Sequence, residues 1–219
     1  MISEIAIKNV LPEVFAGDGE EKFSSQSQVW LHDVTFHKGE TYTVAARSGA
    51  GKSSLCSFIY GNRTDYIGEI TFDGHNIKTF DINFWCELRR KSLAYLPQEM
   101  MLFPELTLLE NIRIKNDITH HKSEQQIAAL AERLGLEAHL QKKAAHLSVG
   151  QQQRAAAIRA VCQPFDFIIL DEPVSHLDEE NNHTLAEIIT EEAASQGAGI
   201  ITTSVGNSLA LSNPIILTL

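Results

Sequence analysis

The feature that most constrains the fold is a glycine-rich loop between an apolar segment and a predicted helix. The segment "TYTVAA", residues 41–46, is apolar and rich in β-branched residues, as expected for a buried strand. The loop "RSGAGKSSL" follows, and residues 55–60 are expected to be helical. The chain therefore has to place a strand, a tight turn and the start of a helix next to one another.

Other segments extend this pattern to an α/β fold with a parallel sheet. "FDFIIL" is a continuous apolar run, typical of a central parallel strand that is covered on both faces. "EQQIAALAERLGL" is a predicted helix, because Ser123 and Gln126 have capping-box spacing before it. "LAEIITEEAASQG" is a second helix, closed by Gly197. Further strands are expected over residues 2–10, 29–36, 67–73, 197–204 and 214–219, and residues 97–164 are expected to be mostly helical.

Composition limits the class of protein. A chain of 219 residues with 43% hydrophobic residues is expected to form one domain with an inserted lobe. The net charge of −10 argues against binding nucleic acid through its phosphates. No secretory signal and no apolar run long enough to span a membrane is recognised. Cys56, Cys86 and Cys162 are far apart and are expected to be reduced, buried thiols.

The glycine-rich loop is a candidate phosphate site. Gly49 and Gly51 let the backbone turn its N–H groups inward, Lys52 adds a cation, and Ser53 offers a hydroxyl to Mg²⁺. The pattern G-x-x-x-x-G-K-[ST] is matched except that Ala46 occupies its first position. A glycine-rich turn that starts a helix by chance is the alternative. The remaining candidate contacts in the loop are Arg47, Ser48, Ala50 and Ser54.

Two acidic residues provide the second half of the candidate site. Asp171 and Glu172 come at the end of "FDFIIL", which is predicted to be a buried strand. One carboxylate there can hold hydrated Mg²⁺, and its neighbour can polarise an attacking water. Alternatively, the two acidic residues could lie in an ordinary loop with no role in a site. This alternative is remote because the chain carries both the glycine-rich loop and the acidic strand end.

Three further segments carry a resemblance to a family. "LSVGQQQR", residues 147–154, is similar to the signature "LSGGQQQR" of the ATP-binding cassette (ABC) ATPases. "SHLD" follows the acidic strand, and "LPQEMMLFPELTLLENI" resembles the segment that carries the family's glutamine loop. The resemblance covers essentially the whole chain. It implies a phosphate-loop NTPase fold of the ABC type, with a parallel-sheet core, an antiparallel β lobe and an inserted helical lobe. The single domain would then span residues 1–219, with the core and β lobe at about 1–97 and 164–219 and the helical lobe at about 98–163.

The resemblance also implies a mechanism in which two copies pack head to tail around ATP and Mg²⁺. Glu172 and Gln98 would then be catalytic, and Ser53, Gln98 and Asp171 would hold the metal. An aromatic residue would stack on adenine; Phe15 is the first candidate and Phe23 the second, and packing of Phe15 on the sheet is equally favoured. The residues expected to act across the interface are Ser148, Gly150 and Gln151 of the signature, with Asp178 connecting the two sites.

Three positions depart from the family pattern. Ala46 is tolerable if its φ is negative. Val149 replaces the first glycine of the signature pair, and a β-branched residue is unfavourable at positive φ. Val205, or Ser204 if the count slips by one, stands where the family has a histidine that contacts the γ-phosphate. We therefore expect ATP binding and ATP-driven closure to survive, with slow or partner-dependent hydrolysis.

The loop and the segment "FDGHNIKTFDINFWCELRRKSLAYLPQ" resemble one branch of the family, which serves lipoprotein release, macrolide export and cell division. That resemblance implies a cytoplasmic subunit on the inner face of the membrane, paired with itself or a paralogous cassette and docked on transmembrane permease-type subunits. "MMLF", residues 100–103, would form part of the docking groove, or else pack in the core. An ATP-gated regulatory module without transport is the second hypothesis. A soluble ABC protein in translation or DNA repair is a weak third.

Overall fold

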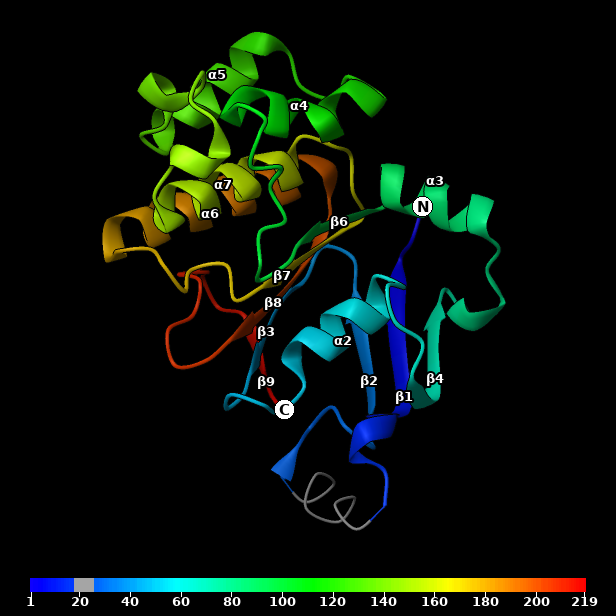
Figure 1. The fold of residues 1–219 in the computed structure, drawn as a ribbon. Coiled ribbons are helices and arrows are strands. Elements are labelled where there is room, and N and C mark those ends of the chain that lie inside the picture. The colour runs from blue at the N-terminus through cyan, green and yellow to red at the C-terminus, as the bar shows by residue number, and fades with distance from the viewer. Residues whose placement is uncertain (18–25) are drawn as a thin grey trace.

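The structure is a computed structural model that describes residues 1–17 and 26–219. These residues form two β-sheets, and most of their helices lie above the sheets in the view of Figure 1. The larger sheet is parallel and has the strand order β6-β7-β8-β3-β9. Its strands are β3 (Thr41–Ala45), β6 (Leu93–Leu96), β7 (Phe167–Asp171), β8 (Gly199–Ser204) and β9 (Ile215–Thr218). This sheet confirms the predicted parallel core.

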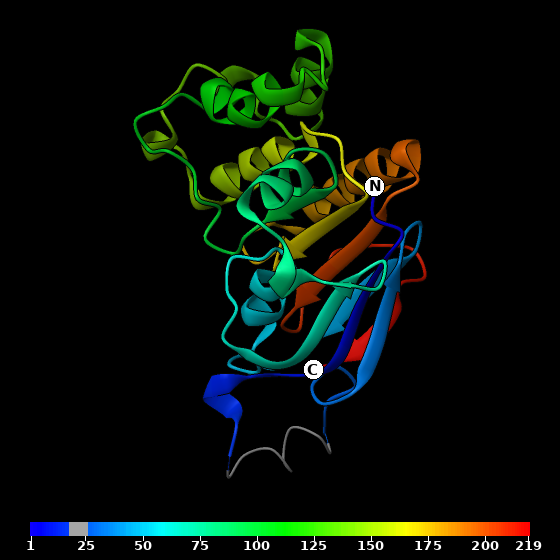
Figure 2. The ribbon, with the colours of Figure 1, turned by 90° about the vertical axis from the view of Figure 1, so that its right-hand side faces the viewer.

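The smaller sheet is antiparallel and has the order β2-β1-β4-β5. Its strands are β1 (Glu4–Pro12), β2 (Asp33–His37), β4 (Tyr66–Phe72) and β5 (His75–Asn76). Figure 2 shows the strands of this sheet in front of those of the parallel one, as expected for an antiparallel β lobe. The strand expected over residues 29–36 is shorter than predicted. Trp30 is buried in a turn and Leu31 has a φ of 60°, so the extended backbone begins only at Asp33.

The α-helices of the described residues are α2 (Lys52–Ile59), α3 (Ile82–Lys91), α4 (Leu108–Thr119), α5 (Glu124–Arg133), α6 (Val149–Val161) and α7 (Glu179–Gln196). Four 3₁₀ turns lie at Glu13–Phe15, Ile77–Thr79, Glu137–His139 and Ala144–His146. The Ser123–Gln126 capping box at the start of α5 is present as predicted. Helix α3 and strand β6 were not expected from the sequence.

The interior is divided by the parallel sheet, and alternate residues of β7 show the division. Ile168 and Leu170 face a cluster that also contains buried residues of α4, α5, α6 and α7. Phe167 and Ile169 face a second cluster, formed with α2 and the antiparallel sheet. Strand β7 is buried along its whole length, which agrees with the prediction of a strand covered on both faces.

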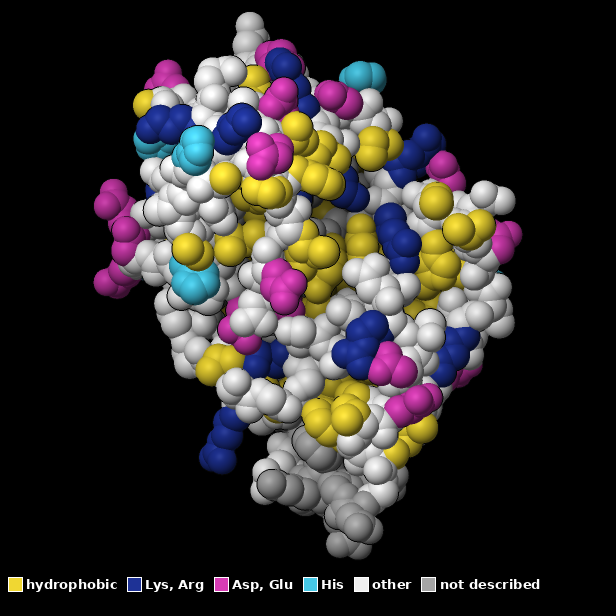
Figure 3. Space-filling view, in the orientation of Figure 1, with side chains coloured by type: hydrophobic (Ala, Val, Ile, Leu, Met, Phe, Trp, Pro, Cys, Tyr) yellow, Lys and Arg dark blue, Asp and Glu magenta, His cyan; other side chains and the backbone are white. Residues whose placement is uncertain are grey.

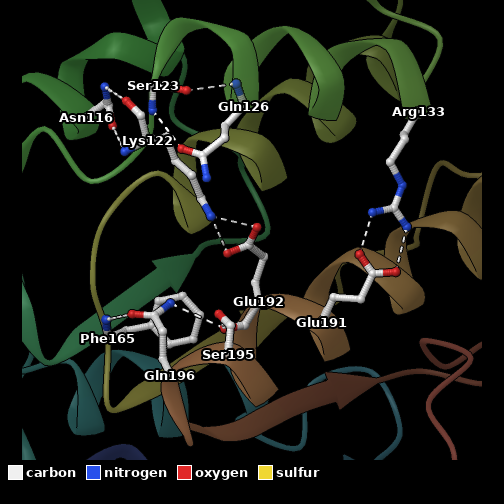
Figure 4. A network of polar contacts seen from close by, with 10 residues as sticks. All are labelled: Asn116, Lys122, Ser123, Gln126, Arg133, Phe165, Glu191, Glu192, Ser195 and Gln196. Atoms are coloured by element: carbon white, nitrogen blue, oxygen red, sulfur yellow. Dashed lines mark hydrogen bonds and ion pairs between the residues drawn. The ribbon is translucent and has the colours of Figure 1, made fainter.

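Ion pairs join the upper helices to α7 (Figure 4). Nζ of Lys122, in the loop between α4 and α5, lies 2.7 and 2.6 Å from the two carboxylate oxygens of Glu192. Arg133 of α5 donates two hydrogen bonds to Glu191, at 2.5 and 3.0 Å. The loop that carries Lys122 is itself held by Asn116, whose side chain bonds the backbone N–H and carbonyl of Lys122.

The cysteines correct one expectation. All three are free thiols, and Cys56 and Cys162 are buried, but Cys86 is exposed on α3. Helix α3 lies at the surface and buries only Leu88, so Cys86 has no core to enter. Within residues 1–17 and 26–219, no helix is long and apolar enough to cross a membrane.

Candidate functional site

The glycine-rich loop links the end of β3 to the start of α2, and it leaves that helix without a side-chain cap. Gly49 and Gly51 have φ values of 81° and 95°, a left-handed conformation that glycine adopts without steric cost. Helices α3 to α7 each begin with a capping side chain: Asp81, Thr107, Ser123, Ser148 and Asp178. Within residues 1–17 and 26–219, no side chain caps the start of α2 in this way. A helix N-terminus of this kind fits an anion, because its dipole and its free donors both favour negative charge.

Lys52 places a buried ammonium group beside this helix start. Its Nζ donates a hydrogen bond to the Arg47 carbonyl at 3.1 Å and lies 3.3 Å from Oε1 of Glu172. Gln98 lies next to both halves of the site: Oγ of Ser53 is 3.4 Å from its Oε1, and its Nε2 is 3.5 Å from Oε2 of Glu172. Four predicted residues from three distant segments therefore converge. Ser53, Gln98 and Glu172 offer side-chain oxygen atoms, the donors that Mg²⁺ prefers, so the residues present fit the metal.

Asp171 is almost fully buried, and its carboxylate is oriented by a residue that the sequence analysis missed. Thr203 on the neighbouring strand β8 donates from Oγ1 to Oδ1 of Asp171 at 2.7 Å. The same Thr203 oxygen accepts a hydrogen bond from the backbone N–H of Glu172 at 3.1 Å. One hydroxyl thus connects both acidic residues, and its position follows from the register that pairs Asp171 with Thr203.

Glu172 has a φ of 49°, an unfavourable conformation for a residue with a side chain. Its carbonyl accepts a hydrogen bond from Nε2 of Gln153 at 3.1 Å, so the backbone is held on both sides, by Thr203 and by Gln153. Gln153 is buried in α6 and also bonds Ser175 and the N–H of His176. Gln153, like Thr203, was not predicted from the sequence. The "QQQ" run was a visible signal, but it did not show which glutamine turns inward.

The signature residues form the start of α6. Ser148 and Gln151 make a capping box, with hydrogen bonds of 3.3 and 2.9 Å. Val149 is the first residue of the helix, and its φ is not positive. The expectation of backbone strain at Val149 is therefore wrong. A Cβ on Gly150 would lie 2.9 Å from the His176 carbonyl, which packs the signature against the loop after β7.

The same turn carries the remaining predicted contacts. Asp178 caps α7 by accepting from the N–H of Asn181 at 2.8 Å, and its pKa is lowered by that bond and by the Asn181 side chain. No hydrogen bond of Ser148, Gly150, Gln151 or Asp178 within the described part of the chain reaches residues 46–54.

The aromatic candidate lies beside the loop. A Cβ on Gly51 would be 3.1 Å from the Phe15 ring and 3.1 Å from the Trp30 ring, and Nε1 of Trp30 donates to the Ala50 carbonyl at 2.9 Å. Phe15 is half-buried and packs against the core of the antiparallel sheet. It thus packs on the sheet and lies next to the loop at the same time. Phe23 lies outside the described residues.

The other loop residues are placed as follows. Arg47, Ser48, Gly49 and Ser53 are exposed, and Oγ of Ser54 accepts a hydrogen bond from Arg63 at 3.0 Å. Ala46 is absent from the residues with positive φ and donates to the Ser204 carbonyl at 3.1 Å, so alanine fits there. Val205 follows β8 and is exposed. Among residues 1–17 and 26–219, no histidine bonds to Lys52, Gln98 or Glu172.

Comparison with known proteins identifies this arrangement. The family described as ABC transporter matches residues 31–175, which is more than half of the chain. The chain belongs to this family. It is an ABC transporter ATP-binding protein, and such proteins bind and hydrolyse ATP.

Three relatives show the breadth of the similarity. The ABC transporter ATP-binding protein YtrE of Bacillus subtilis is 33% identical over 73% of this chain and 71% of its own length. The glutamate/aspartate import ATP-binding protein GltL of Escherichia coli is 34% identical over 82% and 76%. The lipoprotein-releasing system ATP-binding protein LolD of Shewanella denitrificans is 29% identical over 82% and 79%.

A solved structure has the same fold. It is a dimeric ATP-binding cassette in a post-hydrolysis state, bound to ADP and Pi, with a TM-score of 0.74 and 23% sequence identity. The match covers 91% of this ABC protein and 87% of that chain. The combination of parallel sheet, antiparallel sheet and helices is thus that of an ABC cassette.

Proposed function

We propose that this ABC protein is the energy-coupling subunit of a bacterial transporter-type complex, in which two copies close head to tail on ATP and drive a transmembrane partner. The observation that carries the proposal is the uncapped start of α2, with the buried ammonium of Lys52 beside it. That place takes an anion, and the family match makes the anion the phosphates of ATP.

The ligand-free contacts suggest how binding prepares the reaction. Lys52 exchanges its 3.3 Å contact with Glu172 for phosphate oxygens. Glu172 is then free to accept a proton from water, while Thr203 and Gln153 keep its backbone in place. Ser53, Gln98 and Asp171 would hold Mg²⁺, which neutralises charge on the phosphates when it is bound.

The second half of the site would come from the other copy. Ser148, Gly150 and Gln151 begin α6, whose N-terminus is exposed, and Asp178 begins α7 nearby. Packed against the phosphate loop of the partner copy, the α6 N-terminus would face the γ-phosphate. Phe15 would contact the adenine from beside Gly51. A paralogous cassette in place of the second copy would serve the same geometry.

Hydrolysis is proposed to be slow. The side chain of Val205 offers no hydrogen bond where the family has a histidine, and losing one donor to transition-state charge typically costs about 10²–10³ in rate. This departure also favours a second candidate function: an ATP-gated regulatory module that signals through a membrane partner without transport. Both candidates place the protein on the cytoplasmic face of a membrane, and neither involves nucleic acid.

The test uses purified protein and its Glu172→Gln variant. We expect Mg-ATP to convert the variant to a dimer in size-exclusion chromatography with light scattering, and Lys52→Ala to abolish dimer formation and binding of labelled nucleotide. Wild type should hydrolyse ATP slowly and Glu172→Gln more slowly still. A variant that stays monomeric at saturating Mg-ATP, with Lys52→Ala binding nucleotide normally, would refute the proposal.

A further inference from the structure

His176 lies in the turn between β7 and α7, and its side chain is exposed. The backbone of this turn is fixed, because the N–H of Ser175 donates to the Glu172 carbonyl at 3.3 Å. The N–H of Leu177 donates to the Val174 carbonyl at 3.2 Å. Within the described part of the chain, the imidazole ring of His176 makes no hydrogen bond or ion pair. The backbone is therefore held in place while the ring remains able to contact another molecule.

The backbone of His176 is attached to the signature at the start of α6. Its N–H donates to Oε1 of Gln153 at 3.0 Å, and its carbonyl would lie 2.9 Å from a Cβ on Gly150. Figure 3 shows histidine side chains exposed on the left of the molecule, where α6 and α7 begin. His176 thus adjoins Gly150 in space and Asp178, the cap of α7, in sequence. Both of these neighbours are proposed to face the second copy.

Gln153 links the turn that carries His176 to Glu172 of the same copy. Its Nε2 donates to the Glu172 carbonyl at 3.1 Å while its Oε1 accepts from His176. Gln153 is only 1% exposed, so water hardly competes for these bonds. The same buried side chain therefore sets the positions of Glu172 in one site and of the imidazole at the signature surface.

The γ-phosphate site lacks one donor that the family resemblance implies. Val205 stands where the family has a histidine, and its side chain has no hydrogen-bonding group. A histidine ring carries one N–H donor when it is neutral and two when it is protonated, and phosphate oxygens are strong acceptors. A histidine that the second copy presents to the γ-phosphate would supply this donor in either protonation state.

We propose that His176 is a catalytic residue that acts across the dimer interface, where its imidazole donates a hydrogen bond to the γ-phosphate held by the phosphate loop of the other copy. The proposal rests on the proposed function, in which the head-to-tail dimer places Ser148 and Gly150 at that phosphate. The backbone of His176 packs on Gly150 and so follows it to the interface. No covalent bond forms or breaks at the imidazole, which stabilises the charge that develops on the phosphate.

A donor on the facing copy makes hydrolysis depend on closure of the dimer. The imidazole reaches the γ-phosphate only while the two copies are in contact, whereas the family's histidine belongs to the copy that binds the nucleotide. Slow hydrolysis that requires the dimer is the expected result. The wild-type turnover that remains without a histidine at position 205 would then pass through His176.

Mixed dimers test whether the imidazole acts on the other copy. Limiting wild type is combined with an approximately tenfold excess of either Glu172→Gln or Glu172→Gln/His176→Ala before Mg-ATP is added, so that most wild type enters mixed dimers. In both mixtures the one site with an intact Glu172 lies on the wild-type copy. The two mixtures differ only in the imidazole that faces this site from the excess copy.

We expect phosphate release to be at least about tenfold slower with the double variant in excess than with Glu172→Gln in excess. His176→Ala alone should be slower than wild type by a similar factor, and an excess of Glu172→Gln should restore its turnover. His176→Gln, which keeps an N–H donor, should lose less. The matched control is His183→Ala, at an exposed histidine of α7, which should stay within about twofold of wild type.

A second measurement uses dimers of one variant only. Val205→His places an imidazole in the copy that binds the nucleotide, so His176→Ala should change the turnover of Val205→His by less than about twofold. A loss as large as in the wild-type background would show that the two imidazoles do not serve the same phosphate, and it would overturn the inference. This measurement stays decisive even if a dimer with a single intact site does not turn over.

Other results also overturn the inference. Equal turnover of the two mixtures, with a single intact site active, would place any role of His176 in its own copy. Turnover of His176→Ala within about twofold of wild type would remove the residue from the reaction. Light scattering with Mg-ATP separates the two proposals: if Glu172→Gln forms dimers while His176→Ala keeps full turnover, only the role of His176 fails. Circular dichroism shows that each variant is folded.

Discussion

The ion pair between Lys122 and Glu192 is predicted to be a principal polar link between the upper helices and α7 (Figure 4). The two side chains are only 10% and 14% exposed, and Nζ lies 2.6 and 2.7 Å from the carboxylate oxygens. Removing one partner of a fully buried pair costs about 3–5 kcal/mol, because the remaining charge stays desolvated. Since both groups retain some contact with water, we expect Glu192→Gln to lower the free energy of unfolding by about 2–3 kcal/mol.

Urea denaturation followed by circular dichroism measures this loss. The matched control is Arg133→Gln, which breaks the Glu191 pair; its side chains are 36% and 60% exposed, so the expected loss is below about 1 kcal/mol. The double variant Lys122→Met/Glu192→Leu removes both charges and should recover most of the loss. This prediction is refuted if Glu192→Gln costs no more than Arg133→Gln. It is also refuted if the double variant loses as much stability as Lys122→Met alone and Glu192→Leu alone added together.

Three further predictions concern the site and the thiols. Val205→His should raise the ATP turnover of the dimer by about 10²–10³, measured by phosphate release, and no increase would mean that Val205 does not occupy the histidine position. Cys86 is exposed, whereas burial raises the pKa of Cys162 to about 12. Native protein at pH 8 should therefore release one equivalent of thionitrobenzoate from DTNB quickly, and rapid labelling of Cys162 would contradict its burial. Gly150→Ala places a methyl group about 2.9 Å from the His176 carbonyl and should lower the melting temperature, whereas an unchanged value in calorimetry would show that the turn yields without cost.

The sequence predicted the parallel core and most of the residues that the structure brings together at the candidate site, because those features have local signatures. The glycine-rich loop, the apolar strand before Asp171 and the capping box at Ser123 each lie within about ten residues of chain. Helix α3 was missed for a physical reason. Ile82 and Phe84 are exposed and only Leu88 is buried, so the segment has no apolar periodicity that points to a core.

The missed site residues depend on contacts between distant parts of the chain. Thr203 orients Asp171 through a strand register that joins positions 32 residues apart. Gln153 reaches the Glu172 carbonyl only because α6 packs over the end of β7. The absence of strain at Val149 depends on its place as the first helical residue, after Ser148 rather than within the turn. None of these facts follows from residue type or spacing alone.

Because no side chain of the described residues caps α2, a bound nucleotide would supply the acceptor for the first N–H groups of this helix. In the free protein, the amides at Lys52 and Ser53 have no acceptor from the chain's capping side chains, so they should exchange hydrogen with solvent early. A bound phosphate closes that turn as Ser148 closes α6. Ligand at about one hundred times its dissociation constant adds roughly 2.7 kcal/mol to the folded state. Nucleotide occupancy and the rigidity of the turn before α2 are therefore linked. A thermal-shift titration with nucleotide would measure this link.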